Sequence, residues 1–172
     1  VQDLAVVGTP AMTSSNSLTG GVLSVLYGLG DGTYRLPQTF AIPAQAMSVK
    51  VADVNGDGLP DLLTSGSGDS FSLFHNTGNS QFASRIGIPN TTGITSGDCA
   101  IGSDSHSIAV ADFNSDGRAD VAVLRTTAGI GNISILLGGE KESGFELSST
   151  FTAGNEPTGI VSEDVNGDRK PD

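Results

Sequence analysis

Short apolar runs with alternating polar positions recur along the chain, separated by clusters of Gly, Asn, Asp, Ser and Thr. Alternation of apolar and polar residues over roughly four to eight positions is typical of half-buried β-strands. In the middle of the chain, four such runs follow one another, namely MSVKVAD, DLLTSG, SFSLFH and ASRIGI. The pattern predicts a unit of four short antiparallel strands, and an all-β protein as the fold class.

The same order of runs returns further along the chain as HSIAVAD, DVAVLR, NISILL and ELSSTF. Near the N-terminus, QDLAVVG, VLSVLYG and QTFAIP fit the second, third and fourth strands, and TGIVSED near the C-terminus fits a first strand. Such internal repetition indicates a repeat architecture, and we expect a segment of a longer repeat chain. The predicted divisions are a partial unit (1–43), a complete unit (44–89), an insert (90–105), a complete unit (106–153) and a first strand with its loop (154–172).

Two inserts interrupt the repeat, at residues 8–21 and 90–105. Inserts in repeat proteins usually map to surface loops on one face. We therefore expect these two segments to provide contact surfaces for a partner.

An acidic loop follows each predicted first strand, in the sequences VADVNGDGLPD, VADFNSDGRAD and SEDVNGDRKPD. Counted from the Asp that ends the strand, positions one, three, five and nine are Asp or Asn in all three copies. Alternate side chains of a tight loop point inward, and such a set of oxygen ligands suits Ca²⁺ better than Mg²⁺. In the first loop, the expected ligands are the side chains of Asp53, Asn55, Asp57 and Asp61 and the backbone carbonyl of Leu59.

Position six of the loop is expected to be left-handed. Gly58 and Gly117 permit the sharp turn there, whereas the third loop has Arg169. A left-handed Arg costs about 1 kcal/mol or more, so we expect a weaker or distorted third site.

Two alternatives to a calcium loop of this kind are weighed on the same residues. Asp and Asn also favour turns without any metal, which explains one loop well but three copies with retained carboxylates less well. An EF-hand ends on a Glu at position twelve and lies between helices, whereas here the last acid is at position nine and strands flank the loop.

The repeated DxNxDGxxD loop between strands resembles the FG-GAP/VCBS-type repeat, the blade unit of integrin α-subunit β-propellers and of many bacterial secreted and surface proteins. VLSVLYGLGDGTY is especially similar to the bacterial versions, and the resemblance covers nearly the whole chain apart from the inserts. It implies one propeller blade per repeat, about three blades in this segment, and two to three Ca²⁺ ions on one face. A closed propeller usually needs about 4 to 8 blades, so neighbouring sequence or other chains must supply the rest.

The resemblance also assigns ligands in the other loops. Asp3 matches only the last ligand of a loop whose other members are missing. The second set is Asp112, Asn114, Asp116, the carbonyl of Arg118, and Asp120, and the third is Asp164, Asn166, Asp168, the carbonyl of Lys170, and Asp172.

The charge balance excludes some functions. Lys and Arg total 8 against 19 Asp and Glu, for a formal net charge of -11. Nucleic-acid binders show basic patches, and anionic membranes attract basic segments, so neither partner is expected. No run of residues approaches the length of a membrane span.

Residues that could support catalysis are few. The only cysteine, Cys99, allows no internal disulfide and is expected to be a buried, inert thiol. The only histidines, His75 and His106, lie at predicted strand ends and are expected at the surface or partly packed. Since no nucleophile elbow or phosphate loop is present, we expect no enzyme.

The expected function is a calcium-stabilised, extracellular structural or adhesive scaffold, with a fibre or larger assembly as one form. Its expected partners are a protein or glycan ligand or further copies of the same protein. A lectin-like propeller that binds carbohydrate and an accessory domain of a secreted enzyme stay open as alternatives. Asn90 and Asn132 begin Asn-x-Ser/Thr sequons and are candidates for glycosylation in a secretory protein.

Overall fold

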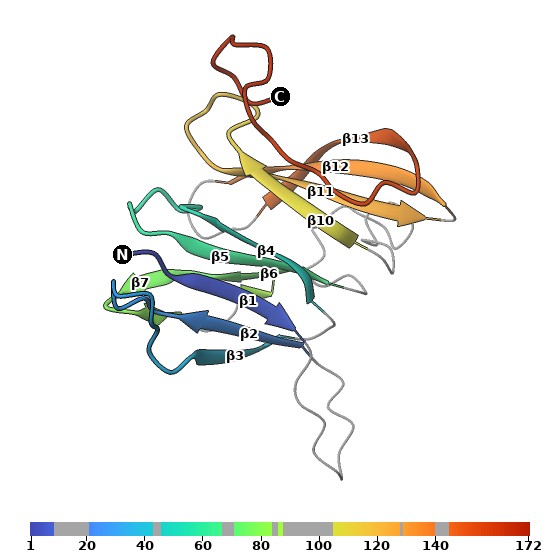
Figure 1. Cartoon of the computed structure of the whole chain (residues 1–172). Helices are drawn as coiled ribbons and strands as arrows, with labels where there is room; N and C mark the ends of the chain where they lie inside the picture. Colours follow the sequence, from blue (N-terminus) through green and yellow to red (C-terminus); the bar gives the residue numbers. More distant parts are fainter. Residues whose placement is uncertain are drawn as a thin grey trace.

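The computed structural model describes residues 1–8, 21–42, 46–66, 71–83, 86–87, 105–127, 129–139 and 145–172. Every regular element in these residues is a β-strand, and the strands form three antiparallel sheets stacked one above another, together with one short hairpin (Figure 1). The predicted all-β fold is confirmed, since sheets form where the alternating runs predict them.

Each sheet corresponds to one predicted unit. The N-terminal sheet has the order β1-β2-β3, with β1 at Leu4–Gly8, β2 at Gly21–Leu26 and β3 at Gln38–Ile42. The middle sheet has the order β4-β5-β6-β9, with β4 at Ala46–Ala52, β5 at Asp61–Gly66, β6 at Phe71–Phe74 and β9 at Ile86–Gly87. The hairpin consists of β7 at Asn76–Gly78 and β8 at Gln81–Phe82. The C-terminal sheet has the order β10-β11-β12-β13, with β10 at Ser105–Ala111, β11 at Asp120–Thr127, β12 at Ile130–Gly138 and β13 at Phe145–Asn155.

The strand predicted near the C-terminus, within 154–172, is not formed. β13 extends to Asn155, and residues 156–172 contain no strand. A ladder needs a neighbouring strand, and no second strand of this unit lies beside the segment in the described part of the chain. The third loop nevertheless closes, because the N–H of Asp172 donates to the carbonyl of Glu163 at 3.0 Å.

The middle strand β5 contributes to two hydrophobic cores because successive side chains of a strand point to opposite faces. Leu62 packs between the N-terminal and middle sheets, in a cluster with Leu23, Ile42 and Phe74. Its neighbour Leu63 is fully buried between the middle and C-terminal sheets. Burial of one such leucine contributes about 1.5–3 kcal/mol, so the contacts between sheets are a main source of stability.

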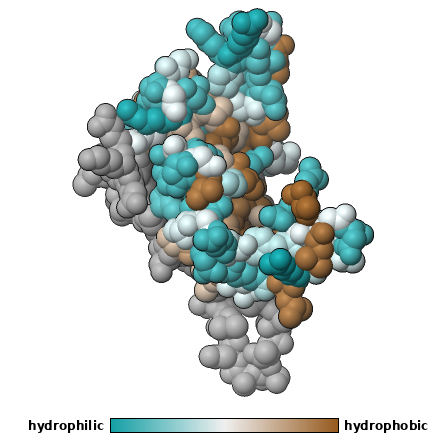
Figure 2. All heavy atoms as spheres, turned by 90° about the vertical axis from the view of Figure 1, so that its left-hand side faces the viewer, coloured by the Kyte–Doolittle hydropathy of each residue, from teal (hydrophilic) through white to brown (hydrophobic). Residues whose placement is uncertain are grey.

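The acidic loops leave the sheets at equivalent places. Asp61 pairs with Ala52 at the end of β4, and Asp120 pairs with Ala111 at the end of β10. The loops therefore project from the same end of the stack, at the left and top of Figure 1. Figure 2 views the molecule from this end and shows hydrophilic loops with hydrophobic atoms between them.

Candidate metal centre

The first loop is folded by its own carboxylates. Asp53 accepts backbone N–H groups through both oxygens, from Gly56 at 2.8 Å and Gly58 at 2.8 Å. The Asn55 side-chain oxygen accepts the N–H of Asp57 at 3.0 Å, and the Asp57 carboxylate accepts the N–H of Leu59 at 2.8 Å. Short Asp and Asn side chains stabilise turns in this way, so positions one, three and five fix the loop backbone.

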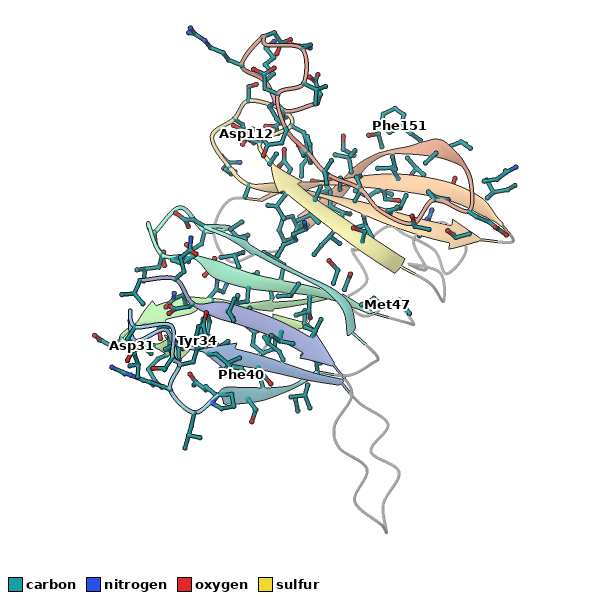
Figure 3. All side chains as sticks on the ribbon, viewed as in Figure 1. Asp31, Tyr34, Phe40, Met47, Asp112 and Phe151 are labelled. Carbon is teal, nitrogen blue, oxygen red and sulfur yellow. The ribbon has the colours of Figure 1, made fainter. Side chains whose placement is uncertain are left out.

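The second and third loops repeat this scheme. Asp112 accepts the N–H of Gly117 at 2.8 Å, and Asp164 accepts that of Arg169 at 2.7 Å. At position seven, the N–H groups of Arg118 and Lys170 donate to the position-five carboxylates at 2.9 Å. The repeated sequence thus gives a repeated hydrogen-bond pattern, and Figure 3 shows Asp112 in its loop above β10.

Two positions in each loop have left-handed backbone. At position six, φ is 84° for Gly58, 85° for Gly117 and 68° for Arg169, so the expected left-handed Arg is present. Position four is left-handed as well, which the sequence interpretation missed, and Ser115 has a φ of 62° there. The two non-glycine residues each have a conformation that L-residues adopt at a cost of about 1 kcal/mol.

Position nine holds the loop to the rest of its sheet. Asp61 and Asp120 are fully buried. Asp61 accepts the N–H of Val54 at 3.1 Å and, with its other oxygen, the N–H of Asn76 at 2.8 Å. The Asp120 carboxylate accepts the N–H of Gly138 at 2.8 Å in the same way. These carboxylates connect the loop to the residue that ends or follows the third strand of the unit.

The N-terminal sheet contains the same position-nine contact. Asp3 accepts the N–H of Gly28 at 2.8 Å, although Asp3 is exposed. In the third loop, Asp172 accepts the N–H of Val165 at 3.1 Å and is also exposed. The position-nine Asp therefore makes a loop contact or a third-strand contact in every unit.

Within the second loop, the pKa of Asp116 is lowered. The largest cause is the hydrogen bond from the Asn114 side chain, and the guanidinium of Arg118 adds a smaller effect. The Nη1 atom of Arg118 lies 3.5 Å from the Asp116 carboxylate. Both contacts favour the ionised carboxylate, which is the form that binds cations.

The chemistry of the loops fits a hard cation. Each loop offers three carboxylates and one amide oxygen within nine residues. A carboxylate has about four acceptor positions, so an oxygen that accepts one N–H retains capacity for a cation. Among the described residues, no group of three or more His, Cys, Asp or Glu side chains gathers as a metal cluster. In this structure, the loop carboxylates accept backbone N–H groups.

The sequence interpretation missed the environment of His75. This residue is buried, and its Nδ1 atom lies 3.3 Å from Oδ2 of Asp61. It follows β6 at the place where the other units have Tyr27 and Leu137, so alignment of the repeats indicates a packed position. The expectation that His75 is a surface or partly packed residue is thus wrong, because the side chain is buried. The side chain of His106 lies outside the described residues.

Of the remaining predicted residues, the structure describes Asn132. Asn90 and Cys99 lie outside the described residues, as do most of both inserts. Asn132 is half-buried within β12, where it pairs with Arg125 on one side and Thr152 on the other. Glycosylation at either asparagine stays a prediction.

The antiparallel sheets are stacked, and each of the two four-stranded sheets has an acidic loop between its first and second strands, an architecture that is consistent with propeller-like blades. The chain belongs to the FG-GAP-like repeat family, whose model matches residues 2–64 and again 53–123. The two matches overlap at the first acidic loop, which agrees with a repeating unit. No curated protein matches the chain.

Proposed function

We propose that the chain is a calcium-stabilised module of an extracellular or cell-surface protein, where it serves as a structural or adhesive scaffold. The observation that supports this proposal is the recurrence of one loop in three copies. Each copy has the same oxygen groups at the same spacing and the same hydrogen-bond pattern.

The residues that would hold calcium are those at positions one, three, five and nine, with the carbonyl at position seven. Bound Ca²⁺ would supply positive charge among three carboxylates, and leave each loop with a net charge near -1. Asp61 and Asp120 are buried and already connect their loops to the sheets. The cation would therefore stabilise the connection between the first two strands of a blade, in two to three sites.

The location follows from the affinity of such sites. Extracellular calcium modules bind with dissociation constants of roughly 10⁻⁴ to 10⁻³ M, which only a calcium-rich compartment can fill. The net charge of -11 opposes nucleic acid and anionic lipid as partners. No helix in the described ranges has the length and apolarity of a membrane span.

The partners we propose are further blades or copies of the same protein, or a protein or glycan ligand on a surface or in a matrix. The outward face of the N-terminal sheet supports the first of these. Leu4 and Val6 are 46% and 51% exposed there, on the face opposite the core residues Ala5 and Val7. An apolar sheet face of this kind is suited to pack against another sheet. The proposal assigns no catalytic residue.

Calorimetric titration with Ca²⁺ and thermal unfolding with and without a chelator test the proposal. The matched control for the role of ligand charge is a variant with Asp53→Asn and Asp112→Asn. The amide oxygens still accept the loop N–H groups, but two of the proposed ligands lose their negative charge. We expect saturable Ca²⁺ binding and a higher melting temperature in millimolar Ca²⁺, both reduced in the control variant. Equal melting temperatures with and without Ca²⁺ in the parent protein would contradict the proposal.

A further inference from the structure

Two of the three acidic loops have a glycine directly after the asparagine at position three. These pairs are Asn55–Gly56 and Asn166–Gly167, whereas the second loop has Asn114 followed by Ser115. All three asparagines are exposed. Asparagine is a thermolabile residue, because the backbone nitrogen of the next residue can attack its side-chain carbonyl. The loops thus contain three comparable asparagines that differ in the residue that follows.

The first loop positions the Asn55 amide for this attack. Its side-chain oxygen accepts the N–H of Asp57 at 3.0 Å, in a turn that folds the side chain back towards the nitrogen of Gly56. Negative charge develops on this oxygen when the carbonyl carbon becomes tetrahedral, and the N–H of Asp57 stabilises that charge. The Asn55 Nδ2 atom donates to the Asp57 carboxylate at 3.0 Å, which keeps the amide in this orientation.

The residue after the asparagine decides which loops react. In the other two loops, the N–H of Asp116 donates to the Asn114 side chain at 2.9 Å, and that of Asp168 to the Asn166 side chain at 2.8 Å. The turn is therefore the same in all three copies. A glycine has no Cβ and changes conformation readily, so its nitrogen reaches the carbonyl carbon with little strain, whereas the Cβ of Ser115 restricts the backbone.

We infer that Asn55 and Asn166 are sites of spontaneous deamidation in the folded protein, and that Asn114 is spared. In the first loop, the Gly56 nitrogen loses its proton to solvent and bonds to Cγ of Asn55. The Cγ–Nδ2 bond breaks, and the amide group takes up a proton and leaves as ammonia. Water then opens the five-membered imide at either carbonyl, which gives aspartate or isoaspartate.

One hydrogen bond of the first loop must open before this reaction. The N–H of Gly56 donates to the Asp53 carboxylate at 2.8 Å. Both residues are exposed, so water replaces this bond at a small cost in free energy. The bond therefore slows the attack but does not prevent it.

The products change the loop. An aspartate at position three has no N–H to donate to Asp57, so two carboxylates face each other where Asn55 makes a hydrogen bond. An isoaspartate adds a methylene group to the backbone ahead of positions five to nine. Both products therefore disturb the first and third loops and leave the second unchanged. The inference rests on the asparagine–glycine pairs and does not require calcium.

Peptide mapping by mass spectrometry tests the inference. Folded protein is incubated with chelator at mildly alkaline pH, and a sample digested without incubation gives the background. Trypsin places the three asparagines on different peptides, namely 51–85, 86–118 and 142–169. We expect Asn55 and Asn166 to convert about tenfold faster than Asn114, a ratio that corresponds to about 1.4 kcal/mol in the barrier.

Two variants exchange the residue after the asparagine. Gly56→Ser gives the first loop the pair of the second, and Ser115→Gly does the reverse. The loop accepts a serine at position four, since Ser115 has a φ of 62° there and a Cβ added to Gly56 meets no atom within 4 Å. We expect Gly56→Ser to slow Asn55 to the rate of Asn114, and Ser115→Gly to raise Asn114 to the rate of Asn55. Asn166 is the internal reference and should convert at the parent rate in both variants.

Incubation of the parent protein in urea gives the rates of the unfolded chain. The inference is overturned if Asn55 and Asn166 stay intact in the folded protein while the unfolded chain converts, or if Asn114 converts as fast as they do. Unchanged rates in the two exchange variants also overturn it. Chelator is present throughout, so none of these results depends on calcium binding, and the proposed function is tested separately.

Discussion

The buried carboxylate of Asp120 holds the end of β12, since it accepts the backbone N–H of Gly138 at 2.8 Å. The Asp3 carboxylate makes the same bond to Gly28 at 2.8 Å, but in an exposed position. The two pairs are the same contact in two repeat units, one with a buried carboxylate and one with an exposed carboxylate. Their comparison separates the effect of burial from that of the hydrogen bond.

We expect Asp120→Ala to lower the free energy of unfolding by about 3 kcal/mol, because it leaves the half-buried N–H groups of Phe113 and Gly138 without an acceptor. Asp3→Ala is the control and should cost less than about 1 kcal/mol, since water can replace the exposed carboxylate. Urea denaturation measures both. Equal losses in the two variants would show that burial does not decide the effect.

Asp57→Ala should separate turn stabilisation from calcium binding. With chelator present, the variant loses exposed hydrogen bonds to Asn55 and Leu59, and we expect a loss below about 1 kcal/mol. In Ca²⁺ the loss should be larger, because a ligand that binds the folded state stabilises it by mass action. Thermal unfolding in both conditions provides the measurement.

The control for Asp57→Ala is Asp31→Ala. Asp31 accepts the N–H of Thr33 at 2.9 Å in an exposed turn outside the acidic loops. Its replacement should have the same effect with and without Ca²⁺. If Asp57→Ala also shows no difference between the two conditions, the first loop is only a turn.

The left-handed position six predicts opposite effects of two substitutions. Gly117→Arg should lower the free energy of unfolding by about 1 kcal/mol, because φ is 85° there. An added Cβ meets no atom within 4 Å, so the backbone conformation and not a clash causes the loss. Arg169→Gly should relieve the same strain in the third loop, seen as slower hydrogen exchange of the loop amides. Faster exchange in Arg169→Gly would contradict this account of the strain.

The Asp31 carboxylate should show a lowered pKa in a ¹³C titration. The hydroxyl of Thr33 is the main cause, and its N–H adds to it, so the pKa lies below the ordinary value of 3.8. Since the pKa is lowered on folding, the contribution to stability is present above about pH 4 and is lost as pH falls through the lowered value. Thr33→Val should move the Asp31 pKa back towards 3.8, and an unchanged pKa would contradict the role of the hydroxyl.

The sequence predicted the strands well where local pattern and packing agree. The runs around Leu62 and Val121 alternate clearly, and both lie in central strands with neighbours on each side. The run at 158–163 alternates too, but forms no strand, because a strand requires a partner that no pattern within the run can supply. The acidic loops were predictable because Asp and Asn fix turns through contacts a few residues away.

The sequence by itself determined the order of the strands in the three sheets, the three acidic loops and the left-handed Arg169, since all of these depend on contacts near in sequence. It predicted neither the β7–β8 hairpin nor the lack of a strand in 156–172. Only the tertiary structure decided that Asp61 and Asp120 are buried while Asp3 and Asp172 are exposed. It also brought His75 to Asp61 and opened a cavity between two loops. The physical reason is that burial depends on which sheet faces which, and that arrangement arises from packing between units distant in the chain.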